Sequence, residues 1–244
     1  MAHDTPCRIR LWRRSADEHV LLLVLHHIIA DFWSLEVFVH ELGLLYAATQ
    51  TTVAAGDLPP ASLLLEERQT LPPPGQPYTA YVHWQQQMLA GPDGARHQAY
   101  WQQQLAAPLP VLNLPTDRPR PPLQTWHGTA ACQFLSATLT QALKTVSQAH
   151  DTTLYTTLLS AFYVLLYRYT GQADILVGSP MACRRQAAWS GVLGYFANPV
   201  VLRAQLTGTQ SCSALIHQVR QTVLGAFEHQ HYPFPWLVEN LQVA

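Results

Sequence analysis

The sequence predicts an α/β fold, and three observations indicate it. Apolar residues make up 48% of the 244-residue chain, which suits a packed core. Short segments with the two-residue period of strands are followed by segments with helical spacing. Proline-rich stretches at 72–75 and 114–122 interrupt these elements, so one large domain or two small ones fit the length.

The first elements expected are two strands and a helix. Residues 7–12 alternate Arg8 and Arg10 with apolar neighbours, as in a half-buried strand. Residues 20–25 are an almost wholly apolar run, which predicts a strand covered on both faces. Ser34 is predicted to cap a helix. The apolar residues of this expected helix follow helical spacing: Leu35, Phe38, Val39, Leu42, Leu45 and Tyr46.

Helices and strands are expected to alternate along the rest of the chain. The pattern weakens from Thr49 to Pro77, where Pro59–Pro60 and then residues 72–75 interrupt any regular element, and a lobe boundary is placed after residue 74. The expected helices are 81–89, 98–105, 136–149, 154–169 and 213–227, and the expected strands are 129–135, 174–178 and 200–206. Gly171 is predicted to end the helix at 154–169, and the tail that begins at Tyr232 is not expected to become helical until after Pro235.

Composition excludes several classes of protein. Only 12% of residues are charged and the net charge is −1, so the chain lacks the basic character of nucleic-acid binding. No apolar run reaches the ~18 residues needed to cross a bilayer, and the first residues do not resemble a signal peptide. A cytoplasmic location is therefore expected. The cysteines are far apart, which argues against disulfides or a zinc site: Cys7, Cys132, Cys183 and Cys212.

Two adjacent histidines at the end of the apolar run are the strongest candidates for chemistry. His26 and His27 leave the strand, where they are expected to be desolvated, and Asp31 follows in the loop before the helix. One interpretation is purely structural, with Asp31 as a helix cap. A metal site is disfavoured because neighbouring residues at a strand end point to opposite sides. The third interpretation is a base catalyst, with the loop fixed by an Asp31–arginine pair.

Four segments together resemble the condensation domains of nonribosomal peptide synthetases. Residues 26–34 (HHIIADFWS) are similar to the third family motif, HHxxxDGxS. Residues 78–84 (YTAYVHW), 192–199 (VLGYFANP) and 229–234 (HQHYPF) resemble the fourth, fifth and sixth motifs, in family order. The resemblance implies an α/β fold with the two-lobe sandwich of chloramphenicol acetyltransferase.

The resemblance also implies which part of the domain is present. Residues 1–74 would be the end of a truncated N-lobe that carries the HHxxxD motif, and residues 75–244 most of the C-lobe without the final motif. The first two motifs are expected upstream of Met1 and the seventh downstream of Ala244. The sheet of the truncated lobe is then expected to have an exposed edge, and this lobe is expected to be the less stable half.

The roles of the site residues follow from the same resemblance. His27 is implied to be catalytic, and no metal or redox cofactor is implied. Structural support is expected from His26, Asp31 and Ser34, and the substrate tunnel is expected to include Phe32, Trp33, Tyr195 and Asn198. Family members draw the arginine partner of the aspartate from the upstream segment, so Asp31 is expected to lack its normal counter-ion. Only substitutes by proximity are available: Arg8, Arg10, Arg13 and Arg14.

This sequence departs from the family pattern at several positions. Phe32 replaces the glycine that follows the aspartate, which is expected to narrow the substrate channel or reshape the loop. Ala80 and His231 each replace an aspartate, and Pro235 replaces a glutamate. None of these changes falls on His27.

The implied activity is amide-bond-forming acyl transfer in peptide antibiotic biosynthesis. Both substrates would be tethered to the 4′-phosphopantetheine arms of peptidyl or acyl carrier proteins. Adenylation or ketosynthase domains would be the neighbouring partners, with no nucleic acid and no membrane. Alternatives are an inactive remnant that only binds carrier proteins, or an epimerising or ester-forming relative. A heterocyclising domain is disfavoured because that subtype replaces the first histidine with aspartate.

Overall fold

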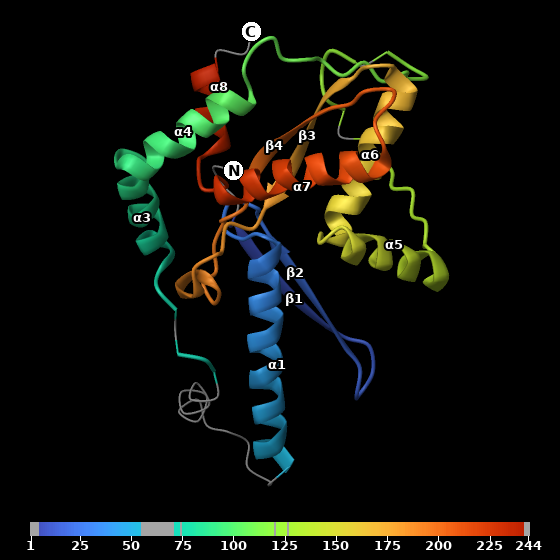
Figure 1. Cartoon of the computed structure of the whole chain (residues 1–244). Coiled ribbons are helices and arrows are strands. Elements are labelled where there is room, and N and C mark those ends of the chain that lie inside the picture. The colour runs from blue at the N-terminus through green and yellow to red at the C-terminus, as the bar shows by residue number, and fades with distance from the viewer. Residues whose placement is uncertain (1–4, 55–70, 74, 120, 126, 242–244) are drawn as a thin grey trace. The chain divides into compact units, whose positions relative to one another are not determined.

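A computed structural model describes residues 5–54, 71–73, 75–119, 121–125 and 127–241 (Figure 1). Contacts divide the chain into two compact units. Unit 1 is Met1–Ala95 with Met181–Asn198, and unit 2 is Arg96–Pro180 with Pro199–Ala244. The predicted break at Pro59–Pro60 lies outside the described residues. The lobe boundaries expected from the family resemblance remain a prediction.

Unit 1 begins with the predicted hairpin and helix. Strands β1 (Cys7–Arg13) and β2 (His19–Leu25) pair antiparallel, with Ile9 opposite Leu23. Helix α1 (Phe32–Ala54) follows after a short loop (Figure 1). The other described elements that lie wholly in this unit are helix α3 (Tyr78–Ala90) and a short 3₁₀ turn at Ala187–Trp189.

The expectation that residues 20–25 are covered on both faces is wrong. Val20 is 42% exposed, Leu21 43% and Val24 49%. Among the described residues, β2 pairs only with β1, and a two-stranded ribbon offers little apolar surface to cover either face. The apolar run therefore predicts the strand correctly but not its burial.

Unit 2 contains most of the remaining elements. They are helices α4 (Pro92–Gln104), α5 (Ala137–Ala149), α6 (Leu154–Thr170), α7 (Cys212–Glu228) and α8 (Phe234–Leu241), and strands β3 (Asp174–Met181) and β4 (Asn198–Gln205). The first residues of α4 and the residues Met181 and Asn198 belong to unit 1. Strands β3 and β4 form a two-stranded sheet, and α6 packs against both α5 and α7 (Figure 1).

Local capping chemistry explains where several of these helices begin and end. The side chains of Ser136, Thr153 and Ser211 each accept a hydrogen bond from the backbone amide three residues later. Gly171 ends α6 with φ of 68°, the left-handed conformation expected of a glycine C-cap. Helix α8 starts at Phe234, earlier than expected, because Pro235 falls in the first helical turn, where no intrahelical amide donor is required.

The strand expected at 129–135 is not present. These residues adopt no regular structure, and Phe134 is 91% exposed. A strand exists only where a neighbour completes its hydrogen-bond ladder, and the described sheets contain only β1 with β2 and β3 with β4. None of the described helices is long and apolar enough to cross a membrane.

A buried pair of histidines joins α4 to the end of α7 in unit 2. The Nδ1 atoms of His97 and His229 lie 2.8 Å apart, so one ring donates and the other accepts. The His229 ring stacks on Tyr100, with centroids 4.0 Å apart. Burial lowers the pKa of His229 below its usual value; Glu228 opposes this effect and Arg96 adds to it.

Unit 2 should lose stability on mild acidification because of this pair. Since the pKa of His229 is lower in the folded state, the unfolded chain binds the proton more readily. Stability is therefore fully present above about pH 6.5, the usual histidine pKa, and is lost as the pH falls below it. Urea titrations at about pH 7.5 and about pH 5.5, followed by tryptophan fluorescence, should show a lower midpoint at the lower pH. The variant His229→Gln should show a smaller change; equal changes in both proteins would contradict the prediction.

Candidate active site

The two histidines lie in a tight turn between β2 and α1. The amide of Ile29 donates to the carbonyl of His26 at 3.0 Å and closes the turn. The amide of Ile28 donates to Nδ1 of His26 at 3.1 Å, so the neutral ring carries its proton on Nε2. The amide of His26 donates to the carbonyl of Pro6. These bonds fix the backbone on both sides of His27 and give His26 a structural contact.

The side chain of His27 is exposed and meets one aromatic ring. The centroids of the His27 and Tyr195 rings are 5.2 Å apart, with the rings nearly perpendicular at 87°. His26 is exposed as well. The expectation that both imidazoles are desolvated is therefore wrong for this chain, because the strand that leads to them is itself uncovered.

Asp31 is buried at the start of α1, where it has several donors. Its side chain accepts hydrogen bonds from the amide of Ser34 at 2.8 Å and the amide of Phe196 at 3.1 Å. Burial alone would raise the pKa of Asp31, but the amide and hydroxyl of Ser34, the Phe196 amide and the Arg184 charge together hold this pKa below its usual value. Asp31 is therefore a carboxylate at neutral pH.

The counter-ion of Asp31 is Arg184, which is not among the four substitutes expected by proximity. Arg184 Nη2 lies 3.1 Å from Asp31 Oδ1, and the two side chains are 1% and 5% exposed. Arg184 Nη1 also donates to the carbonyls of Trp189 and Val192 at 2.6 Å each. Its guanidinium carbon lies 3.8 Å from the centre of the Phe196 ring, a cation–π contact.

Ser34 supports the Asp31–Arg184 pair, but the prediction that it caps the helix is wrong. Helix α1 begins at Phe32, and Asp31 occupies the capping position by accepting from the amide of Ser34. The Ser34 hydroxyl lies 2.8 Å from both Asp31 Oδ1 and the Gly194 carbonyl, so its single proton goes to one of them. The same oxygen accepts from the Gly194 amide at 3.1 Å and from Arg184 at 3.0 Å.

The three other residues predicted to line the substrate tunnel, Phe32, Trp33 and Asn198, differ in their exposure and in their contacts. Trp33 donates from Nε1 to the carbonyl of Ser190 at 2.8 Å and so ties α1 to the segment 183–196. The Phe32 side chain is 81% exposed. Asn198 opens β4, and its amide is a hydrogen-bond donor to the thiol of Cys183. The Phe32 side chain is therefore largely in solvent, whereas Asn198 contacts the buried residue Cys183.

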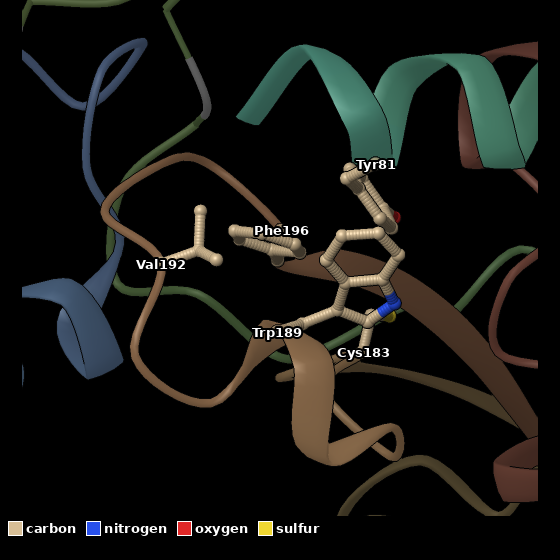
Figure 2. Close-up of a cluster of buried hydrophobic side chains, with 5 residues drawn as sticks. All are labelled: Tyr81, Cys183, Trp189, Val192 and Phe196. Carbon is tan, nitrogen blue, oxygen red and sulfur yellow. The ribbon is translucent and has the colours of Figure 1, made fainter. Parts of the chain in front are cut away.

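A cluster of buried apolar side chains supports the segment that carries Arg184. Figure 2 shows its members: Tyr81, Cys183, Trp189, Val192 and Phe196. The Tyr81 and Phe196 rings have centroids 4.3 Å apart. Burial raises the pKa of Cys183 to about 12, so its thiol stays protonated and unreactive at neutral pH. Within the described parts of the chain, no three His, Cys, Asp or Glu side chains are grouped to hold a metal ion.

Comparison with known proteins identifies the family. The sequence profile described as "Condensation domain" matches residues 1–244. The chain belongs to the condensation-domain family. One of the linear gramicidin synthase proteins from Brevibacillus parabrevis is 40% identical over 97% of this chain, which corresponds to 3% of that protein. Surfactin synthase subunit 1 from Bacillus subtilis (strain 168) is 36% identical over 97% of this chain and 6% of that protein.

Solved structures confirm the predicted α/β fold of the condensation-domain type, which is that of chloramphenicol acetyltransferase. The X-domain from teicoplanin biosynthesis matches 98% of this chain and 51% of its own, with a TM-score of 0.78 and 26% identity. The SgcC5 protein from Streptomyces globisporus matches with a TM-score of 0.74 and 28% identity over 97% of this chain and 50% of its own. This condensation-domain chain thus spans about half the length of these two solved structures.

Sequence reasoning missed Arg184, Gly194 and Tyr78 as members of the site. Arg184 is 153 positions from Asp31, so no local spacing reveals the pair. The available signal is its position shortly before the fifth family motif, which also carries Gly194 and Tyr195. The sequence identifies Tyr78 only as the first residue of the fourth motif.

Gly194 should not tolerate a side chain. A Cβ atom at this position would overlap the ring of Tyr78, whereas one at Gly191 would meet nothing within 4 Å. We expect Gly194→Ala to lower the free energy of unfolding by about 1–3 kcal/mol, the usual cost of overpacking, and Gly191→Ala to have little effect. Urea unfolding of the two variants measures the difference. Equal stability of the two variants would contradict this packing.

Proposed function

We propose that this chain catalyses, or forms the catalytic part of a protein that catalyses, amide-bond formation between two carrier-bound substrates. The donor acyl group and the acceptor amine would each be held as a thioester on the 4′-phosphopantetheine arm of a carrier protein. The amine attacks the donor thioester carbonyl, the C–N bond forms, and the donor arm leaves as a thiol. The observation that carries the proposal is an exposed His27 on a turn that the buried Asp31–Arg184 pair anchors.

The proposed role of His27 is to accept the proton that the amine loses, or to orient the amine for attack. Its ring is exposed, so substrates have access to it from solvent. General acid–base catalysis of this kind contributes about 10²–10⁴-fold. Tethering both substrates supplies proximity in addition. His27 would then return the proton to the leaving thiolate.

The proposed role of Asp31, Arg184 and Ser34 is positioning. The carboxylate caps α1, and the guanidinium ties that cap to the segment 183–196. A buried ion pair is strongly sensitive to the loss of either partner. The turn that carries His27 is therefore fixed both to α1, which directly follows it, and to the segment 183–196, which is far from it in the sequence.

A transfer assay distinguishes this proposal from carrier binding alone. One carrier protein is loaded with an aminoacyl donor and a second with an aminoacyl acceptor, and both are incubated with the chain and with a full-length parent synthetase. Intact-protein mass spectrometry should show a dipeptidyl group on the acceptor arm and a free thiol on the donor arm. Carrier binding without any mass change, by both proteins, would favour an inactive remnant; an epimerised or ester product would favour an epimerising or ester-forming domain.

A further inference from the structure

The ring of Tyr195 makes the one aromatic contact with the exposed imidazole of His27 in the described part of the chain. The two rings meet edge to face, with centroids 5.2 Å apart at 87°. Such a geometry is favourable because the positive edge of one ring faces the negative face of the other. An exposed histidine on a turn otherwise has several rotamers available.

The backbone around Tyr195 is held by three independent hydrogen bonds. The Tyr78 hydroxyl donates to the Tyr195 carbonyl at 2.5 Å. On one side, the Gly194 amide donates to the Ser34 hydroxyl at 3.1 Å. On the other side, the Phe196 amide donates to the Asp31 carboxylate at 3.1 Å. Position 195 is therefore fixed to the same residues that hold the start of α1.

We propose that Tyr195 is a positioning residue that selects the rotamer of His27. This inference rests on the proposed function of His27. Contacts with Asp31, Ser34 and Tyr78 fix the backbone at residues 194–196. The Tyr195 ring, held in place by that backbone, then restricts the side chain of His27, which has few other restraints. Acyl transfer needs the imidazole at a set position relative to the amine, because small misplacements of a catalytic group are costly.

The phenol hydroxyl of Tyr195 takes no part in this role, which separates ring contact from hydrogen bonding. Tyr195→Phe should therefore behave as the wild type. Tyr195→Leu retains apolar bulk but removes the aromatic face, and Tyr195→Ala removes both. Leu193→Ala is the matched control, since Leu193 is 48% exposed and lies two residues away on the same segment.

The first measurement is independent of turnover. Ring-current shifts of the carbon-bound His27 protons, recorded by NMR, report the aromatic contact directly. They should be unchanged in Tyr195→Phe and Leu193→Ala, and should move toward the values of an unstacked histidine in Tyr195→Leu and Tyr195→Ala. Identical His27 shifts in the wild type and Tyr195→Leu would overturn the inference, even if the protein proves to have no transfer activity.

The second measurement is the transfer rate in the full-length parent. We expect Tyr195→Leu and Tyr195→Ala to reduce kcat by about 10–10²-fold with KM for the loaded carriers nearly unchanged, and Tyr195→Phe to restore the wild-type value. A rise in KM at constant kcat would overturn the positioning role and indicate substrate binding instead. A wild-type rate in Tyr195→Leu together with displaced His27 shifts would also overturn it, since the rotamer would then be irrelevant to transfer.

Discussion

Replacing His27 with alanine should slow amide formation by about 10²–10⁴-fold, the usual contribution of a general acid–base residue. The reason is geometric as well as chemical. His27 is exposed, and hydrogen bonds fix the backbone of its turn on both sides of it. Asp31 fixes the start of the helix that follows. The alanine variant keeps those backbone bonds, so binding of the loaded carriers should change little. Steady-state kinetics with loaded carrier proteins measure the loss.

His19→Ala is the control for this prediction. His19 is exposed and lies on the same hairpin, but at the start of β2, the end of the strand opposite to the turn. It should leave kcat and KM unchanged. A comparable loss in both variants would show that general perturbation of the hairpin, not the imidazole at position 27, explains the effect.

Replacing Arg184 with methionine should lower the free energy of unfolding by about 3–5 kcal/mol, the usual cost of removing one partner of a buried ion pair. Methionine retains much of the side-chain length but leaves the Asp31 carboxylate, which is 5% exposed, without this counter-ion. The carbonyls of Trp189 and Val192 also lose their donor. Urea unfolding monitored by circular dichroism measures the change.

Two further variants test the cause of that loss. Adding Asp31→Asn to Arg184→Met removes the stranded charge and should recover part of the stability. Arg14→Met, at the exposed Arg14–Glu18 pair, should change stability by less than about 1 kcal/mol. If Arg184→Met proves no worse than Arg14→Met, the buried pair is not what fixes the start of α1.

Elements with local determinants could be predicted from the sequence. The helix expected at 154–169 is α6, Leu154–Thr170, because its apolar spacing, the Thr153 cap and the Gly171 stop all lie within the segment. The predictions of the hairpin and of the loop that carries His26, His27 and Asp31 are confirmed for the same reason. Each depends on residues only a few positions apart.

Features that depend on distant partners could not be predicted. The strand expected at 129–135 has no neighbour to pair with in the described sheets, and the apolar run at 20–25 has exposed faces. The counter-ion of Asp31, Arg184, lies 153 residues away, so no local spacing connects the two positions. Ser34 and Asp31 are both good capping residues; in the structure Asp31 caps the helix, and Ser34 makes a tertiary contact with Gly194 that local spacing does not reveal.

Chemical rescue of His27→Ala by free imidazole tests the central claim most directly. Because His27 is exposed, removal of its ring should leave a site that imidazole reaches from solvent. We expect added imidazole to accelerate amide formation by His27→Ala in a concentration-dependent manner, and to have no such effect on the wild type or on Arg184→Met. If imidazole accelerates His27→Ala no more than it accelerates the wild type, an imidazole at position 27 does not supply the chemistry.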